Sequence, residues 1–280
     1  MKVKITADST CDLPKDLLEE CDIGITPLSI VKDNLSYRDG LEIAPADIFD
    51  YVESDSGICH TTAVNTQEYY DKFSEILKDY DAIVHINIGS KFSACNQNAN
   101  IAASEIENVY VVDSGNLSMG MGYLVLEAAK MVKAGAEAFE VRDWLEQKKD
   151  KAEMSFVIDT LKYLYKGGRC SALAAMGANI LGLKPCIEVA DGLMCVGKKY
   201  RGSATRIAEQ YVTDRLSGRD DIDEQGIFVV HTGDQPEVLQ IIRTTIDRFG
   251  DFKVRYESIA GCTISNHCGP KTFGIMFFRR

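Results

Sequence analysis

Short motifs that carry hydroxyl groups lie in predicted loops beside the ends of strands and helices, and together they fit one kind of site. Thr61 and Thr62 precede a predicted helix, and Ser93 follows a buried strand and begins another helix. Hydroxyls and free backbone N–H groups at helix N-termini hold carboxylates or phosphates. The motifs also supply one arginine, Arg169, and one histidine, His267. With apolar segments between them, this pattern indicates a site for an anionic head group with a lipid tail behind it.

Each of these residues also has a simpler structural interpretation. Ser93 is expected to cap its helix whether or not it binds a ligand, and two adjacent threonines can form a turn or a cap. Arg169 follows Gly167-Gly168, where it can cap the preceding helix or reach an anion with its fork of donors. His267 lies in a Gly-rich stretch before the last strand, and a lone histidine is usually a surface or a core residue. Spacing alone leaves these alternatives open.

Three enzyme motifs are incomplete or missing. The stretch Gly192–Lys199 resembles a phosphate-binding P-loop, but Lys199 stands where Ser or Thr must meet magnesium. Gly120 and Gly122 resemble a dinucleotide fingerprint, but Val125 replaces its third glycine. No G-x-S-x-G motif occurs, and nothing selects one of the four histidines for a catalytic triad. We therefore expect no catalytic residues, and a small-molecule kinase or hydrolase that uses the interdomain cleft is the alternative.

Composition narrows the class of protein further. The net charge of −11 argues against nucleic acid and against anionic membrane surfaces. No apolar run approaches the roughly 18–20 residues that span a bilayer, and the N-terminus predicts no signal peptide. The nine cysteines include no C-x-x-C pair, which indicates reduced thiols and no metal site. We expect a cytoplasmic protein that is not an integral membrane protein and that needs no cofactor beyond a bound ligand.

Predicted strands and helices alternate from end to end, which indicates an α/β fold. In residues 1–155 the repeated strand-helix order predicts a mainly parallel sheet. Residues 156–280 add a strong hairpin signal at Asp191-Gly192 and therefore form a second α/β domain of different topology. The predicted elements include a single strand over Ile23–Val31, a strand over Ala82–Ile88, and helices over Thr66–Lys78, Ser93–Glu105 and Ser171–Leu181.

The ordered set of motifs resembles the DegV family of bacterial fatty-acid-binding proteins over essentially the whole chain. Each motif is weak alone, but their order is specific. They are Ala7-Asp8-Ser9-Thr10-Cys11-Asp12-Leu13-Pro14, Tyr37-x-Asp39-Gly40, Ser90-Lys91-Phe92-Ser93, Asp113-Ser114, Ser118-x-Gly120-x-Gly122, Thr160-Leu161-x-Tyr163-Leu164, Gly167-Gly168-Arg169-Cys170-Ser171, Lys184-Pro185, Asp191-Gly192 and His267-x-Gly269-Pro270.

This resemblance implies a carrier that encloses one long-chain fatty acid between two α/β domains. It implies that the carboxylate is held by Thr61 or Thr62 and by Ser93, with His267 and Arg169 near the head group. It also implies a partner, a separate fatty acid kinase that converts the presented carboxylate to an acyl-phosphate for phospholipid synthesis. The loops after Thr61 and around Ser93 depart from the family's usual sequence, so the resemblance does not fix the length or unsaturation of the tail.

Overall fold

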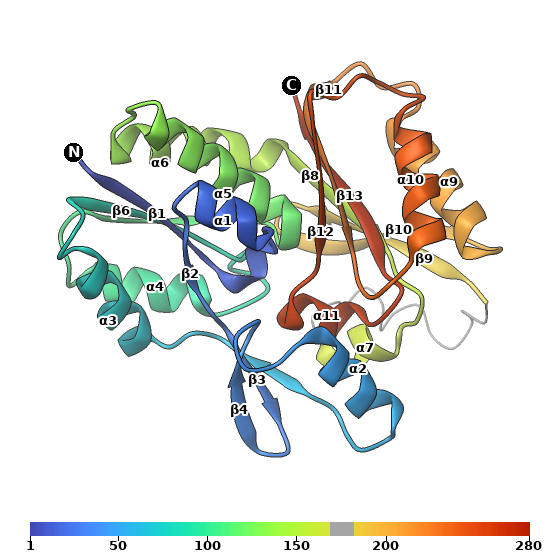
Figure 1. Ribbon diagram of the computed structural model, residues 1–280, viewed down its shortest axis with the longest axis horizontal. Helices are drawn as coiled ribbons and strands as arrows, with labels where there is room; N and C mark the ends of the chain where they lie inside the picture. The colour runs from blue at the N-terminus through green and yellow to red at the C-terminus, as the bar shows by residue number, and fades with distance from the viewer. Residues whose placement is uncertain (169–181) are drawn as a thin grey trace.

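A four-stranded parallel sheet forms the first part of the fold (Figure 1). The computed structural model describes residues 1–168 and 182–280. The sheet has the strand order β2-β1-β6-β7, and all three neighbouring pairs are parallel, as predicted. Its strands are β1 (Val3–Asp8), β2 (Gly24–Thr26), β6 (Ala82–Asn87) and β7 (Val109–Asp113). Helices α1 (Lys15–Glu20), α5 (Ser118–Lys133) and α6 (Ala138–Lys148) lie on one face, and α3 (Thr66–Ile76) and α4 (Cys95–Ala103) on the other.

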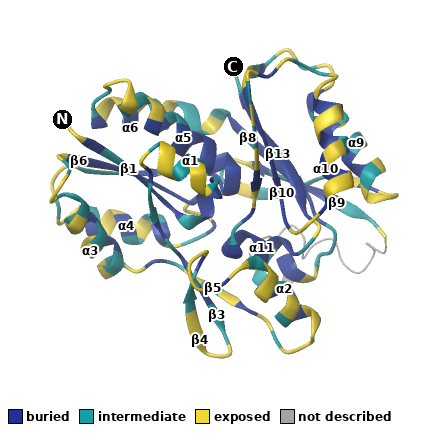
Figure 2. Cartoon of the chain, in the orientation of Figure 1, coloured by how far each residue is buried: buried dark blue, intermediate teal, exposed yellow. Residues whose placement is uncertain are grey.

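A six-stranded sheet forms the second part, in the order β10-β9-β8-β13-β11-β12. Its pairs are antiparallel except β11 with β12. The strands are β8 (Ala152–Val157), β9 (Lys184–Ala190), β10 (Leu193–Tyr200), β11 (Ile222–His231), β12 (Val254–Ile259) and β13 (Phe273–Arg279). Helices α9 (Ala204–Leu216) and α10 (Pro236–Ile246) cover its outer face, with their exposed sides toward solvent (Figure 2). The predicted hairpin is present, and Asp191 and Gly192 both have positive φ, as a tight two-residue turn requires.

A small antiparallel sheet, β4-β3-β5, was not predicted from the sequence. Its strands are β3 (Ser29–Lys32), β4 (Leu35–Arg38) and β5 (His60–Thr62). The sheet shares a small hydrophobic cluster with α2 (Pro45–Glu53) and α11 (Cys262–Cys268). The single strand predicted over Ile23–Val31 is wrong, because β2 ends before Pro27 and β3 belongs to this second sheet. Proline has no N–H to continue a hydrogen-bonded ladder, and the chain changes sheets there.

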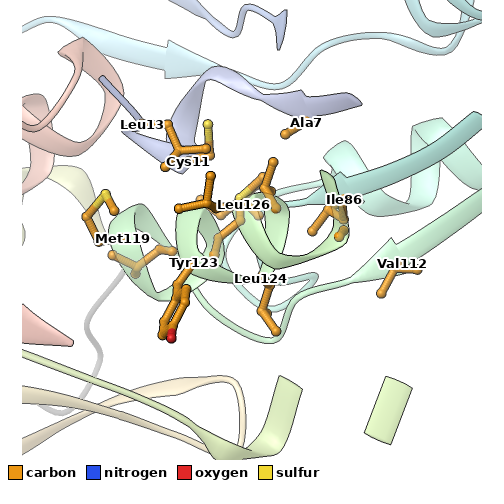
Figure 3. Packing of buried hydrophobic residues seen from close by; sticks show 14 of the residues in the cluster. Ala7, Cys11, Leu13, Ile86, Val112, Met119, Tyr123, Leu124 and Leu126 are labelled. Carbon is orange, nitrogen blue, oxygen red and sulfur yellow. The ribbon is translucent and has the colours of Figure 1, made fainter. Parts of the chain in front are cut away.

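Helix α5 lies between the two large sheets and is buried along most of its length. Figure 3 shows Cys11 and Leu13 on one side of this helix and Tyr123 on the other. The ring of Tyr123 lies 4.4 Å from that of Phe278 and 4.5 Å from that of Phe228, both in the second sheet. A Cβ on Gly122 would lie 2.4 Å from the carbonyl oxygen of Cys11. Gly122, part of the incomplete dinucleotide motif, is therefore needed for the close packing of α5 against the Cys11 backbone.

The hydrophobic core is continuous between the two large sheets. One cluster joins Ile5 and Leu124 of the first part to Met154, Phe228 and other side chains of the second. The expected boundary between residues 155 and 156 falls within β8, whose partners β9 and β13 both lie in the second sheet. The division at this position stays a prediction. The short helices η1 (Ser9–Cys11), η2 (Lys149–Lys151) and α7 (Lys162–Gly167) complete the described elements, and the helix predicted over Ser171–Leu181 lies outside the described residues.

Candidate functional site

A cavity of about 140 Å³ lies between the parallel sheet, the small sheet and the second large sheet. The polar side chains that line it are Thr61, Thr62, Ser93, Thr263 and His267. The rest of its wall is mainly apolar and includes Leu28, Ile88, Phe92, Leu117, Phe156 and Ile264. A smaller cavity of about 10 Å³ shares Leu117, Phe156, Ile264 and Cys268 with it. Such a lining suits an apolar ligand with one polar end.

Thr61 and His267 are separated by 206 positions in the sequence, yet they contact each other at this cavity. The Thr61 Oγ1 and His267 Nε2 atoms are 3.0 Å apart. Thr61 and Thr62 were expected in a loop, but they lie in β5, which pairs with β3. The strand fixes their backbone, so that Thr61 lies opposite Ile30 and Thr62 opposite Ser29. Both threonines line the cavity. The structure therefore brings Thr61, Thr62 and His267 together with Ser93, as expected for the head-group residues.

His267 was expected in a loop, but it lies in the helix α11. The sequence Cys262–Cys268 contains Cys, Thr, Ser and Asn, whose intrinsic helix propensities are low. Tertiary contacts hold this helix instead. The buried carboxylate of Asp39 accepts hydrogen bonds from the Cys262 N–H at 2.8 Å, the Thr263 N–H at 3.2 Å and the Thr263 hydroxyl at 2.7 Å. Asp39, one of the motif residues, therefore positions the helix that carries His267.

Gly167 makes room for the imidazole of His267. A Cβ at position 167 would lie 2.1 Å from Nδ1 of that ring, which is far closer than atoms approach without a shift. The glycine at the end of α7 is thus a requirement of the site and more than a helix terminator. Arg169, which was also expected near the head group, lies outside the described residues.

Ser93 lines the cavity in the turn before α4, but it is not the N-cap residue that the sequence predicted. The helix begins at Cys95, and Ala94 occupies the cap position without a side-chain hydrogen bond. The Ser93 Oγ nevertheless accepts a hydrogen bond from the Cys95 N–H at 3.3 Å and donates one to the Cys95 Sγ at 3.2 Å. Burial, and secondly the charge of Asp8, raises the pKa of the Cys95 thiol to about 11, so this sulfur is protonated at neutral pH.

Several lining residues were not predicted from the sequence. Leu164 of α7, Met194 of β10 and Ile264 and Cys268 of α11 complete the wall. They come from elements that meet only in the folded chain, so no local signal marks them. In residues 1–168 and 182–280, no group of three or more His, Cys, Asp or Glu side chains could hold a metal ion. Within the same ranges, no helix is long and apolar enough to cross a membrane.

The fold and the cavity define a two-part α/β protein with a mainly apolar cavity between its parts. Residues 2–280 match the family model described as "Uncharacterised protein, DegV family". A DegV domain-containing protein of Caldanaerobacter subterraneus subsp. tengcongensis is 32% identical over 279 residues, which cover 99% of this chain and 98% of that protein. The chain belongs to the DegV family, as its motifs indicated.

Solved structures of this family have the same fold. One is a DegV family protein from Thermus thermophilus whose structure is described as fatty acid binding. It matches with a TM-score of 0.91 and 26% sequence identity, and the match covers 100% of both chains. DegV from Bacillus subtilis, described as a fatty acid binding protein, matches with a TM-score of 0.85 and 25% identity, again over 100% of both chains. A stearic acid-binding protein from Eubacterium ventriosum matches with a TM-score of 0.83 and 25% identity over 99% of this chain and 98% of its own.

Proposed function

We propose that this protein is a carrier that encloses one long-chain fatty acid in the cavity between its two parts. The observation that carries this proposal is the contact between Thr61 and His267 at the edge of a mainly apolar cavity that Ser93 also lines. In this proposal Thr61, Thr62, Ser93 and His267 hold the carboxylate, and Arg169 lies beside it. The fatty acid binding described for similar structures supports the same ligand class.

Burial of the tail supplies most of the binding free energy. Each buried methylene contributes about 0.8 kcal/mol, so ~14 methylenes offer on the order of 11 kcal/mol before costs. Ordering the tail and losing its free motion subtract several kcal/mol. The open volume of about 140 Å³ is small for such a tail, so we infer that side chains of the wall move apart when it enters. Met194, which is unbranched and flexible, is suited to such a movement.

We further propose that the protein has no catalytic step of its own and presents the carboxylate to a separate fatty acid kinase, which forms the acyl-phosphate. A carrier with this role keeps the tail enclosed and the carboxylate reachable, and the hydroxyl side chains in the wall of the cavity support that arrangement. The kinase then finds the carboxylate in a fixed position, where small displacements cost large factors in rate. The eight cysteines among the described residues carry free thiols, which supports a cytoplasmic location.

Replacement of Ser93 by alanine tests the carboxylate site. The loss of one hydrogen bond to a charged group is expected to weaken fatty acid binding by about 1–3 kcal/mol, or roughly 5- to 150-fold. Stability should fall by only ~1 kcal/mol, because the Cys95 N–H loses one acceptor. Isothermal titration with stearic acid and thermal melts measure the two effects. Ser90→Ala, an exposed serine of the same turn, is the matched control and should bind normally. Unchanged affinity in Ser93→Ala would assign Ser93 a structural role alone.

A further inference from the structure

The hairpin of β9 and β10 extends beyond the pairing that joins it to the rest of its sheet. β9 pairs with β8 as far as Glu188, and residues 189–194, which we call the hairpin tip, lie beyond that last pair. In the hairpin tip, Val189 and Ala190 pair with the start of β10, the outermost described strand of the sheet. A two-stranded hairpin has little stability of its own. The position of the tip therefore depends on what it contacts.

The hairpin tip contacts the first part of the protein. Nζ of Lys91, which lies 100 positions away in the turn before α4, donates a hydrogen bond to the carbonyl oxygen of Asp191 at 2.7 Å. A Cβ on Gly192 would lie 3.7 Å from the carbonyl oxygen of Gly115 and from Cδ of Lys91, which is an ordinary contact distance. The turn of the hairpin therefore rests on two loops of the first part, and Lys91 fastens it there.

The hairpin tip lines two open spaces. Met194 lines the mainly apolar cavity of about 140 Å³. Residues 189–192 line a separate cleft of about 450 Å³, whose wall also includes Asn116, Glu153 and Arg215. These charged and polar side chains suit water and not a lipid tail. A tip that shifts into this cleft takes Met194 away from the cavity and widens it.

Other walls of the cavity are held more firmly than the hairpin tip. Thr61 lies in β5, which pairs with β3, and the buried Asp39 holds the start of α11 through three hydrogen bonds. The Ile88 N–H donates to the buried Asp8 carboxylate at 3.0 Å. The bond from Lys91 to the tip, in contrast, is exposed to solvent. Solvent-exposed hydrogen bonds over few buried contacts mark the segments of a protein that open most easily.

We propose that the hairpin tip is a movable wall through which the tail of the fatty acid enters and leaves the cavity, and that Lys91 is the latch that holds this wall closed. This inference rests on the proposed fatty acid function. A cavity of about 140 Å³ must widen to admit a long tail, and the neighbouring cleft gives the tip the space to move. Closure of such a segment encloses the ligand, and its opening sets the rate of exchange.

Lys91 could instead attract the ligand carboxylate, since it lies two positions before Ser93. The two roles differ in their effects on rates. A latch is bonded in the closed protein with or without ligand, so its removal raises the rates of entry and release by the same factor and leaves the dissociation constant unchanged. An attracting charge speeds entry, so its removal slows entry.

The test measures entry and release of a fluorescent long-chain fatty acid by stopped flow on delipidated protein. Lys91→Met keeps an unbranched side chain and removes the donor. Both rates should rise roughly 2- to 10-fold, the effect of one hydrogen bond, with an unchanged dissociation constant. Lys199→Met, at an exposed lysine further along β10, is the matched control and should leave both rates as in the wild-type chain.

A second variant acts in the opposite direction. Ala190 is exposed and lines the cleft, so Ala190→Trp places a bulky side chain in the space into which the tip moves. Entry and release should both slow severalfold in this variant. Ala134→Trp, at an exposed alanine after α5, is its control and should leave both rates unchanged. Thermal melts establish that each variant is folded, and if Ala190→Trp does not fold, the paired rates of Lys91→Met still decide.

The outcomes separate this inference from the proposed function. A wild-type chain that binds no long-chain fatty acid would contradict the proposed function and the movable wall with it. A coupled rise of both rates in Lys91→Met, with a coupled fall in Ala190→Trp, would support the movable wall. Any other pattern in a chain that binds the fatty acid, including wild-type rates in either folded variant or slower entry in Lys91→Met, would overturn the movable wall alone.

Discussion

Replacement of Asp39 by alanine is expected to lower the free energy of unfolding by about 3 kcal/mol or more and to weaken fatty acid binding together with it. The buried Asp39 carboxylate accepts from the Cys262 N–H, the Thr263 N–H and the Thr263 hydroxyl, and also from the Ser9 hydroxyl at 3.0 Å. Each donor left buried without a partner costs ~1–3 kcal/mol. Because the low-propensity helix α11 depends on these bonds, its displacement moves His267 away from Thr61.

Urea unfolding and binding of stearic acid measure the two effects of Asp39→Ala. Asp220→Ala, at an exposed aspartate between α9 and β11, is the matched control and should change neither quantity appreciably. Two-state unfolding with an unchanged dependence on urea would show that the mutation acts on the folded state. Wild-type stability and wild-type affinity in Asp39→Ala would contradict the role assigned to this residue in positioning α11.

Loading the delipidated protein with stearic acid should stabilise it by about 4 kcal/mol at a free concentration one thousand times the dissociation constant. The stabilisation arises because the folded cavity binds the ligand and the unfolded chain does not. For chains of this size class, each kcal/mol raises the midpoint by roughly 2–4 °C, so the thermal midpoint should rise by about 8 °C or more. Differential scanning calorimetry with and without the ligand measures the shift.

Acetate is the control ligand for this experiment, because it carries the same carboxylate without a tail. Tail burial dominates the proposed binding free energy, so acetate at the same concentration should leave the midpoint unchanged. Equal shifts with acetate and stearic acid would show that the site recognises only the anion. Absence of any shift with stearic acid, in protein shown to be free of lipid, would count against a fatty acid in this cavity.

The sequence allowed prediction of the parallel sheet and of one hairpin of the second large sheet, because most of their elements are regularly patterned, but it did not predict the strand order of the second sheet. The parallel sheet, its covering helices and the hairpin at Asp191-Gly192 all appear in the structure. The small sheet escaped prediction because its strands have only three or four residues. Leu35–Arg38 alternates apolar and polar side chains, but over too few residues to stand out. Helix α11 escaped because Asp39 and not its own composition stabilises it.

The residues that line the candidate site could be predicted from the sequence, but the buried contacts that hold them in place could not. Thr61, Thr62, Ser93 and His267 stood out through their motifs, and all four line one cavity. The buried polar cluster around Asp8, which includes His85 and Asn87, had a weaker signal in the sequence. His85 and Asn87 interrupt an apolar strand two positions apart, which places them on the same face of β6. Their partners on β1, α3 and α4 are distant in the sequence, so only the folded chain brings them together.

Native mass spectrometry of the purified protein, followed by organic extraction, tests the central claim most directly. Protein expressed in a bacterial host should carry one long-chain fatty acid per chain, because the tail is enclosed and its release is slow when binding is tight. Extraction should return a single molar equivalent of fatty acid and leave a chain that binds stearic acid again. A chain that carries no fatty acid, and that binds none after delipidation, would contradict the account.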